Sequence, residues 1–89
     1  QIKMEPTITE LNKKVELTNS ITVNGKEITE VTLKKMILRP IMKRIVFMTE
    51  ELDRVIIYDG EVEFEAHKDD SEEILIEALK NKIDSEYKK

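Results

Sequence analysis

The chain has 89 residues, the size of one domain, with a net charge of −4, 38% charged residues and no cysteine. The lack of cysteine excludes disulfides, thiolate catalysis and cysteine zinc sites. Its apolar runs are far shorter than the roughly 20 residues of a membrane span, and no signal-peptide pattern is visible. We therefore expect a single cytoplasmic domain over residues 1–89 (in the host cytoplasm if the chain is viral), with a loose arm at 1–6, a frayed tail at 84–89 and no membrane association.

Basic and acidic side chains are separated along the chain. Residues 34–44 are basic without a single acid, whereas residues 59–77 hold nine acids against one base. The two regions could be solvated surfaces that attract each other within one molecule. Alternatively, the basic stretch could serve an acidic partner or head-to-tail self-association.

The N-terminal half predicts a β-hairpin. Ile8, Leu11 and Val15 have a spacing that fits a short helix, with an extended arm as the alternative. Residues 15–23 and 26–33 are rich in β-branched residues and flank Asn24-Gly25, which usually forms a two-residue type I′ turn.

Two registers compete for this hairpin. The two-residue turn puts Ile21 and Val31 on opposite faces. A three-residue loop with a glycine bulge instead pairs Leu17 with Val31 and Val15 with Leu33, which collects one apolar face. We predict the bulged register.

Residues 33–48 allow two structures. Their apolar residues recur at helical spacing, but Pro40 lies in the middle and cannot continue a helix without losing a hydrogen bond. One solution starts a helix with Pro40 at its first position, and the other is a strand over residues 41–47. We predict the helix.

Residues 55–66 predict a second hairpin. Residues 55–58 and 61–66 alternate apolar and polar side chains around Asp59-Gly60, a type I′ turn sequence. This pairing sets Ile57 against Val62 and Val55 against Phe64 on one face. Ile56 and Tyr58 then fall on the opposite face, among glutamates.

The last element is a helix. Asp70 is a suitable N-cap, and Glu73 completes a capping box. An apolar stripe should cover the inner face of the hairpins and contains Leu75, Ile76, Leu79, Ile83 and Tyr87.

These elements predict an α+β fold. Two antiparallel β-hairpins form a small sheet that packs on a C-terminal α-helix, with a short helix in the middle. The predicted core consists of Leu17, Ile21, Val31, Leu33, Val55, Ile57, Val62, Phe64, Leu75, Leu79 and Ile83.

Residues able to carry catalysis are sparse. His67 is the only histidine, and the sequence contains no nucleophile elbow or phosphate-binding glycine loop. On a strand, Glu63, Glu65 and His67 would share one face and could hold a divalent metal, but a solvated strand end explains the same pattern. We therefore predict no catalytic, cofactor or metal site, and no enzyme.

The basic stretch is the candidate interaction site. It lacks aromatic residues that could stack on bases, and it contains flexible methionines, which suit adaptable surfaces for protein partners as well as small cores. Ile56 and Tyr58, the two apolar residues on the outer face of the second hairpin, are also candidates for contact with a partner. The candidate partner-binding residues are Lys34, Lys35, Met36, Arg39, Met42, Lys43, Arg44, Ile56 and Tyr58.

Residues 17–34 carry a family resemblance. They run as an apolar strand, a Val23-Asn-Gly-Lys turn and a second strand that ends in Glu30-Val-Thr-Leu before Lys34. This stretch resembles the start of small phage tail assembly chaperones, in which a V-x-G-K/E turn and an E-L-T-L strand end precede a basic residue. The resemblance implies a non-enzymatic protein that coats the tape-measure protein while the tail tube is built.

These features predict a small, non-enzymatic interaction or assembly protein that binds another protein or itself as a homodimer. The alternative is a small regulator or inhibitor that contacts nucleic acid through residues 34–44. The direction of the basic side chains separates the two. One convex basic stripe favours nucleic acid, whereas basic residues rimming an apolar, methionine-containing patch favour a protein partner.

Overall fold

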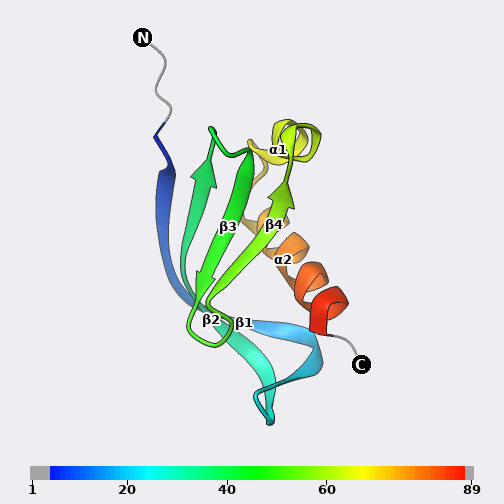
Figure 1. The fold of residues 1–89 in the computed structure, drawn as a ribbon. Helices are drawn as coiled ribbons and strands as arrows, with labels where there is room; N and C mark the ends of the chain where they lie inside the picture. The colour runs from blue at the N-terminus through cyan, green and yellow to red at the C-terminus, as the bar shows by residue number, and fades with distance from the viewer. Residues whose placement is uncertain (1–4, 88–89) are drawn as a thin grey trace.

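The structure, a computed structural model, describes residues 5–87, which form a four-stranded antiparallel sheet and two helices (Figure 1). In chain order the elements are β1 (Thr7–Val23), β2 (Lys26–Arg39), β3 (Arg44–Thr49), β4 (Arg54–Asp59), α1 (Glu61–His67) and α2 (Glu72–Tyr87). The strands lie side by side in the order β1-β2-β3-β4. The predicted α+β class, with a C-terminal helix packed on an antiparallel sheet, is confirmed.

The N-terminal half is extended from the start. Residues 7–23 form β1, so the short helix predicted around Ile8 to Val15 is wrong and the extended alternative is correct. Of the predicted loose arm, residues 1–4 lie outside the described residues, and Glu5 and Pro6 precede β1.

The first hairpin has the two-residue turn, and its bulge lies within β1 and not in the turn. Asn24 and Gly25 have φ angles of 53° and 80°, and Val23 faces Lys26, as a two-residue left-handed turn requires. The irregularity lies inside β1, between the Glu16↔Glu30 and Ile21↔Ile28 pairs, so that Val15 faces Val31. The predicted bulged-turn register is therefore wrong. Val15 and Ile21, which lie on either side of this irregularity, both belong to the buried core cluster.

The β1–β2 hairpin is bent. A second irregularity follows Glu10, where Asn12 has a φ angle of 47°, and such bulges bend strands and increase their twist. The outer part of the hairpin consequently curls under the end of α2 (Figure 1). Asn19 Nδ2 donates a hydrogen bond of 2.8 Å to Asp84 Oδ1 there, which ties β1 to α2.

The middle of the chain is a hairpin, so the predicted helix is wrong. β2 continues to Arg39, residues 40–43 form the loop, and β3 returns from Arg44. The strand alternative was closer, although β3 begins later than residue 41. Pro40 has no N–H to donate within a helix or a sheet, so it lies in the turn. Lys43 closes the loop: it has a φ angle of 55°, and its N–H donates a hydrogen bond to the Pro40 carbonyl.

The predicted hairpin over residues 55–66 is also wrong, because its second half is helix α1. β4 pairs with β3, placing Val55 opposite Phe47 and not opposite Phe64. Glu61, Glu63, Glu65 and Ala66 are better helix formers than strand formers, and only Phe64 in this segment has to be buried. Gly60, with a φ angle of 134°, makes the break between strand and helix.

Helix α2 is the predicted C-terminal helix with a different start. Ser71, not Asp70, occupies the cap, since its carbonyl accepts from Leu75 N–H and its Oγ lies 3.4 Å from Ile74 N. The helix continues through residues 84–87, which were expected to fray, and residues 88–89 lie outside the described part. Neither α1 nor α2 is long and apolar enough to cross a membrane.

The core lies between the sheet and the two helices. Its buried cluster consists of Val15, Ile21, Val31, Leu33, Ile45, Phe47, Leu52, Val55, Phe64, Leu75, Leu79 and Ile83. Eight predicted core residues are buried, Leu17 and Ile57 are half-buried against the cluster, and Val62 is wrong, with 80% of its surface exposed. Val62 is exposed because α1 turns only Phe64 toward the sheet.

Candidate functional site

One face of the sheet carries the helices, and the other face is open. The helical residues Phe64, Leu75 and Leu79 share one buried cluster with Leu33 and Phe47 of the sheet, which places both helices on the same side. Side chains of a strand alternate between faces. The residues between those of the core therefore point to a face that α1 and α2 leave uncovered.

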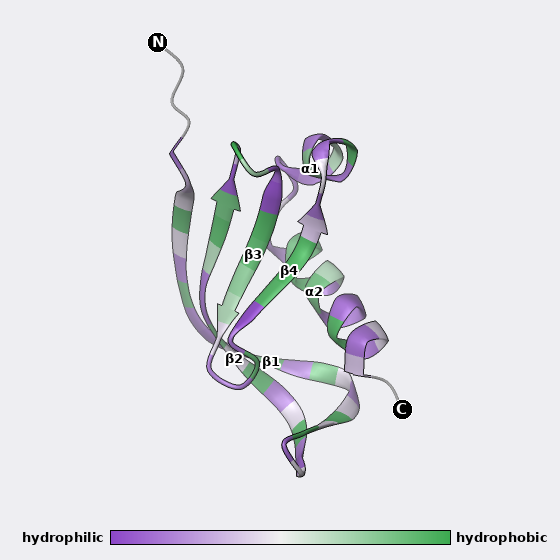
Figure 2. Ribbon diagram, viewed as in Figure 1, coloured by the Kyte–Doolittle hydropathy of each residue, from purple (hydrophilic) through white to green (hydrophobic). Residues whose placement is uncertain are grey.

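We define the open face by the strand pairing. Its central row is aliphatic and crosses all four strands in register, from Ile8 to Ile37 to Val46 to Ile56. The solvated face of an antiparallel sheet normally carries polar residues, so four aliphatic residues in a row are unusual. The β3 and β4 ribbons are hydrophobic along their middle, and hydrophilic residues stand at the start of β3 and at both ends of β4 (Figure 2).

The central row is sheltered by its neighbours. Ile37 is 8% exposed and Val46 is 1% exposed, yet neither belongs to the core cluster. Long side chains flank them on the same face, and the alkyl stems of Lys and Arg can cover apolar surface while their charged ends reach water. At the β1 end of the row, Ile8 is 54% exposed.

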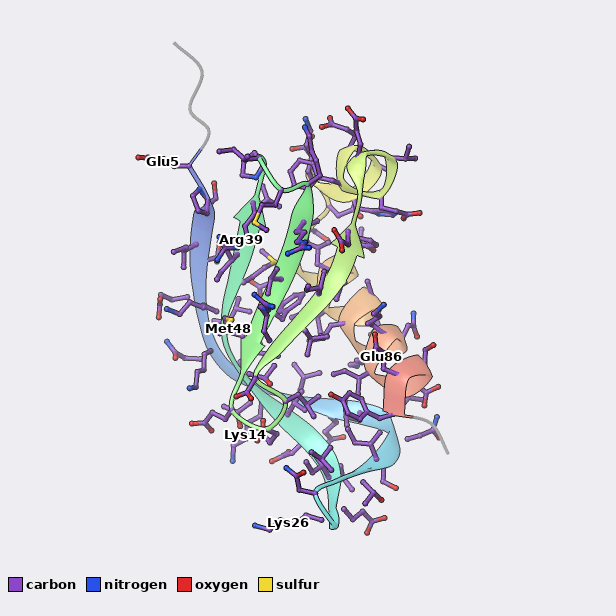
Figure 3. The ribbon with its side chains drawn as sticks, viewed as in Figure 1. Glu5, Lys14, Lys26, Arg39, Met48 and Glu86 are labelled. Carbon is purple, nitrogen blue, oxygen red and sulfur yellow. The ribbon has the colours of Figure 1, made fainter. Side chains whose placement is uncertain are left out.

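Two basic rows flank the aliphatic row. Arg39 faces Arg44 on one side, and Lys35 faces Met48, which faces Arg54, on the other. Figure 3 labels Arg39 and Met48 on the sheet strands, far from Glu86 on α2. The open face is thus an aliphatic row with a cationic rim.

The charges of this rim are only partly compensated. Arg44 Nε donates to Asp59 Oδ1 at 3.0 Å, and Glu10 faces Lys35 across the strands. Among residues 5–87, no ion pair involves Lys35, Arg39 or Arg54. Like charges directly opposite each other destabilise a sheet, so an acidic group placed over Arg39 and Arg44 would relieve their repulsion.

The predicted interaction residues divide between several places. The open face holds Lys35, Arg39, Arg44 and Ile56. Met36 packs against the core cluster, and Lys34 falls at the irregularity between β2 and β3. Met42 is 49% exposed in the β2–β3 loop, beside Ile41 at 63%. The structure therefore does not gather the nine residues on one surface.

Lys43 contacts helix α1, on the side of the sheet that carries the helices. Its Nζ lies 5.4 Å from the centre of the Phe64 ring and 3.3 Å from Glu65 Oε2, and its carbonyl accepts the Gly60 N–H. Hydrogen bonds from Lys68, above all, and from Lys43 lower the pKa of Glu65 below its ordinary value. Lys43 thus joins the β2–β3 loop to α1.

Ile56 and Tyr58 lie on opposite faces, which corrects their predicted common surface. A register shift leaves Ile57 as an extra residue, so Ile56 faces Val46 on the open side and Tyr58 faces Ile45 on the core side. The Tyr58 ring stacks on His67 with a centroid distance of 4.2 Å and an interplanar angle of 6°. Burial first, and then the nearby carboxylates of Asp70 and Glu63, raise the pKa of Tyr58.

The candidate metal residues are not arranged as the strand pattern suggested. Glu63, Glu65 and His67 lie on a helix, where residues two apart point in different directions. His67 Nδ1 is 2.8 Å from Asp70 Oδ2, and Glu65 pairs with Lys43 and Lys68. Within residues 5–87, no three His, Cys, Asp or Glu side chains are placed to hold a metal ion.

A hollow also lies where α2 meets β4. It has a volume of about 460 Å³ and is lined by Arg54, Val55, Ile56, Ile57, Asp59, Lys82, Ile83, Glu86 and Tyr87. Its charges are of both signs, with Arg54 and Lys82 beside Asp59 and Glu86.

Sequence reasoning missed most of the aliphatic row. Ile8, Ile37 and Val46 of the row, and Met48 and Arg54 beside it, are not among the candidate residues. Ile37, Val46 and Met48 are missing because residues 33–48 are interpreted as a helix. The signal was present in the alternation Lys35, Ile37, Arg39, which on a strand puts an aliphatic residue between two cations on one face.

Comparison with known proteins adds no relative to this description. No protein-family model matches the chain, and no curated protein or solved structure matches it.

Proposed function

We propose that this protein is a non-enzymatic interaction protein that binds an acidic, partly apolar polypeptide surface through the open face of its sheet. The observation that carries the proposal is the in-register row of Ile8, Ile37, Val46 and Ile56 between two basic rows. Ile8, which is 54% exposed, and the half-buried Ile56 at the two ends of the row supply apolar contact, and the cationic rim supplies orientation and selectivity for acids.

The arrangement of the basic residues supports a protein partner over nucleic acid. Lys43 is engaged with Glu65 and Phe64 on the helical side, whereas Lys35, Arg39 and Arg54 surround aliphatic residues and Met48 on the open face. The basic stretch therefore does not form one continuous stripe. A rim of cations around an apolar centre is the composition of a protein interface.

An assembly role is consistent with the resemblance of residues 17–34 to phage tail assembly chaperones. In the structure this stretch forms the tip and flanking strands of the β1–β2 hairpin. The resemblance supports the proposal only as an indication of the kind of process, namely non-enzymatic binding of another polypeptide during assembly.

A random-peptide display selection on the immobilised protein tests the proposal. We expect the recovered peptides to combine Asp or Glu with aliphatic or aromatic residues. Their affinity, measured by fluorescence anisotropy, should fall at least about tenfold, or 1.4 kcal/mol, in the Lys35→Glu, Arg39→Glu variant. The Lys26→Glu, Lys80→Glu variant changes the net charge equally, away from the open face, and should bind like the wild type.

Two results would contradict the proposal. One is a set of peptides that bind the wild type and the Lys35→Glu, Arg39→Glu variant equally well. The other is tight, steeply salt-dependent binding of a short DNA duplex or single-stranded RNA that the same variant loses, which would favour the nucleic-acid alternative.

A further inference from the structure

The molecule is electrically polar between its two layers. Residues 59–87, which contain both helices, hold 11 acids and three lysines. The open face of the sheet holds Lys35, Arg39, Arg44 and Arg54, on the side away from the helices. Each copy of the chain therefore presents a basic surface and, elsewhere, an acidic one.

Helix α1 has a surface that complements the open face. Val62 is 80% exposed, the most exposed of the large hydrophobic residues, and it lies between the exposed Glu61 and Glu63. Within the described chain, neither of these glutamates takes part in an ion pair. Successive helical residues point in different directions, so the match to the open face is one of charge and composition: an exposed apolar residue with acidic neighbours on α1, and the cations Lys35 and Arg39 on either side of Ile37 on the sheet.

We propose that the open face of one copy docks on the first turn of α1 of a second copy, in a head-to-tail contact. The inference rests on the proposed function, because it uses the same open face, and it names the partner as this chain itself. Val62 would lie over the aliphatic row, and Glu61 and Glu63 would approach Lys35 and Arg39.

The charges argue against the symmetric alternative. A two-fold pairing of open faces would bring Arg39, Arg44 and Arg54 against the same residues of the partner, which costs free energy. A head-to-tail contact sets cations against acids. It also leaves one open face and one α1 free at the ends of each pair, so association can continue beyond the dimer.

Sedimentation velocity at two ionic strengths provides the first measurement. At about 0.01 M salt, where charges act over about 30 Å, we expect the wild type at roughly 100 μM to form dimers and larger species. At about 1 M salt, where that range is about 3 Å, we expect these species to dissociate. A wild type that stays monomeric at low salt would overturn the proposal.

Two charge-reversed variants make the test specific. Lys35→Glu, Arg39→Glu removes the basic surface, and Glu61→Lys, Glu63→Lys removes the acidic one, so each variant alone should be monomeric. Mixed together, they should associate again, because the unchanged α1 of the first docks on the unchanged open face of the second and the two reversed surfaces also carry opposite charges. A symmetric pairing of open faces does not involve α1 and predicts instead that the α1 variant associates alone.

Controls keep the outcome independent of folding. Val62→Ser removes an exposed apolar side chain without changing charge, and it should raise the apparent dissociation constant at least about tenfold. The Glu16→Lys, Glu27→Lys variant changes the net charge as much as Glu61→Lys, Glu63→Lys does, but on the β1–β2 hairpin. It should associate like the wild type. Association that survives both α1 changes would overturn this inference and leave the peptide-binding proposal standing, because the latter is judged by the display selection.

Discussion

The phenol ring of Tyr58 lies flat against the imidazole ring of His67, with the ring centres 4.2 Å apart. Tyr58 comes from the end of β4 and His67 from the end of α1. His67 also contacts Asp70, with 2.8 Å between Nδ1 and Oδ2, just before α2 begins. This contact joins the last strand to both helices and fixes the direction in which the chain leaves the sheet.

The raised pKa of Tyr58 predicts a loss of stability in alkali. In the folded protein the phenol holds its proton above its ordinary pKa of 10.0, because burial, Asp70 and Glu63 disfavour the phenolate. The unfolded chain releases this proton first, so the stabilisation present below pH 10 declines as the pH rises toward the folded pKa. In urea titrations at successive pH values, Tyr58→Phe should lose less free energy of unfolding over this interval than the wild type. A loss in Tyr58→Phe equal to that of the wild type would contradict the assignment.

The lowered pKa of Glu65 predicts how α1 responds to acid. Lys68 contributes the largest lowering and Lys43 the next. Carbon-detected NMR titration of the Glu65 carboxyl should show its pKa rising toward the ordinary value of 4.5 in Lys68→Met, and by a smaller amount in Lys43→Met. Any stabilisation that the pairs of Glu65 with Lys68 and Lys43 contribute is present at pH values above 4.5, and it is lost as the pH falls through the lower pKa of Glu65 in the folded protein. A larger rise in Lys43→Met would reverse the assigned order of the two lysines.

The packing of α2 on the sheet predicts a large cost for truncating its central residue. Leu79 is 0% exposed in the core cluster, so Leu79→Ala should lower the free energy of unfolding by about 2–5 kcal/mol. Ile74, on the same helix, is 53% exposed, and Ile74→Ala should change it by no more than about 0.5 kcal/mol. Chemical denaturation of both variants measures the difference. Equal effects would mean that α2 does not pack as described.

The two glycines predict unequal costs for added side chains. No atom lies within 4 Å of a Cβ built on either residue, so only the backbone angle matters. Gly25 has a φ angle of 80°, close to the left-handed region that other residues enter at a cost of roughly 1–2 kcal/mol. Gly60 has a φ angle of 134°, where residues with a Cβ are rarer. Gly60→Ala should therefore destabilise the protein more than Gly25→Ala in thermal or urea unfolding, and the reverse order would contradict the break between β4 and α1.

Local sequence signals were sufficient for elements whose own residues carry the decisive preference. The stripe of Leu75, Leu79 and Ile83 predicted the buried side of α2, and these residues are at most 1% exposed. Asn24-Gly25 located the turn of the first hairpin, because both residues tolerate positive φ, although the turn has two residues and is not the predicted bulged loop. The α+β class followed from β-branched runs followed by one amphipathic helix.

Local signals failed where two structures suit the same residues. The alternation in residues 61–66 fits a strand, and its glutamates fit a helix. The tertiary structure decides between them. β4 takes β3 as its partner strand and does not need residues 61–66 for pairing. In helix α1, Phe64 is the one residue that is buried in the core. Residues 33–48 failed for the same reason, because helical spacing and strand alternation overlap until a partner strand is known.

The sequence by itself determined which residues are apolar, where the first hairpin turns and where the charges lie along the chain. Only the tertiary structure decided which face each strand residue occupies. The irregularities after Glu10, Glu16 and Leu33 and at Ile57 each shift the pairing register, and a shift of one residue moves every following side chain to the other face. The open face, with Ile37 and Val46 between its cations, exists because those shifts direct these residues away from the helices.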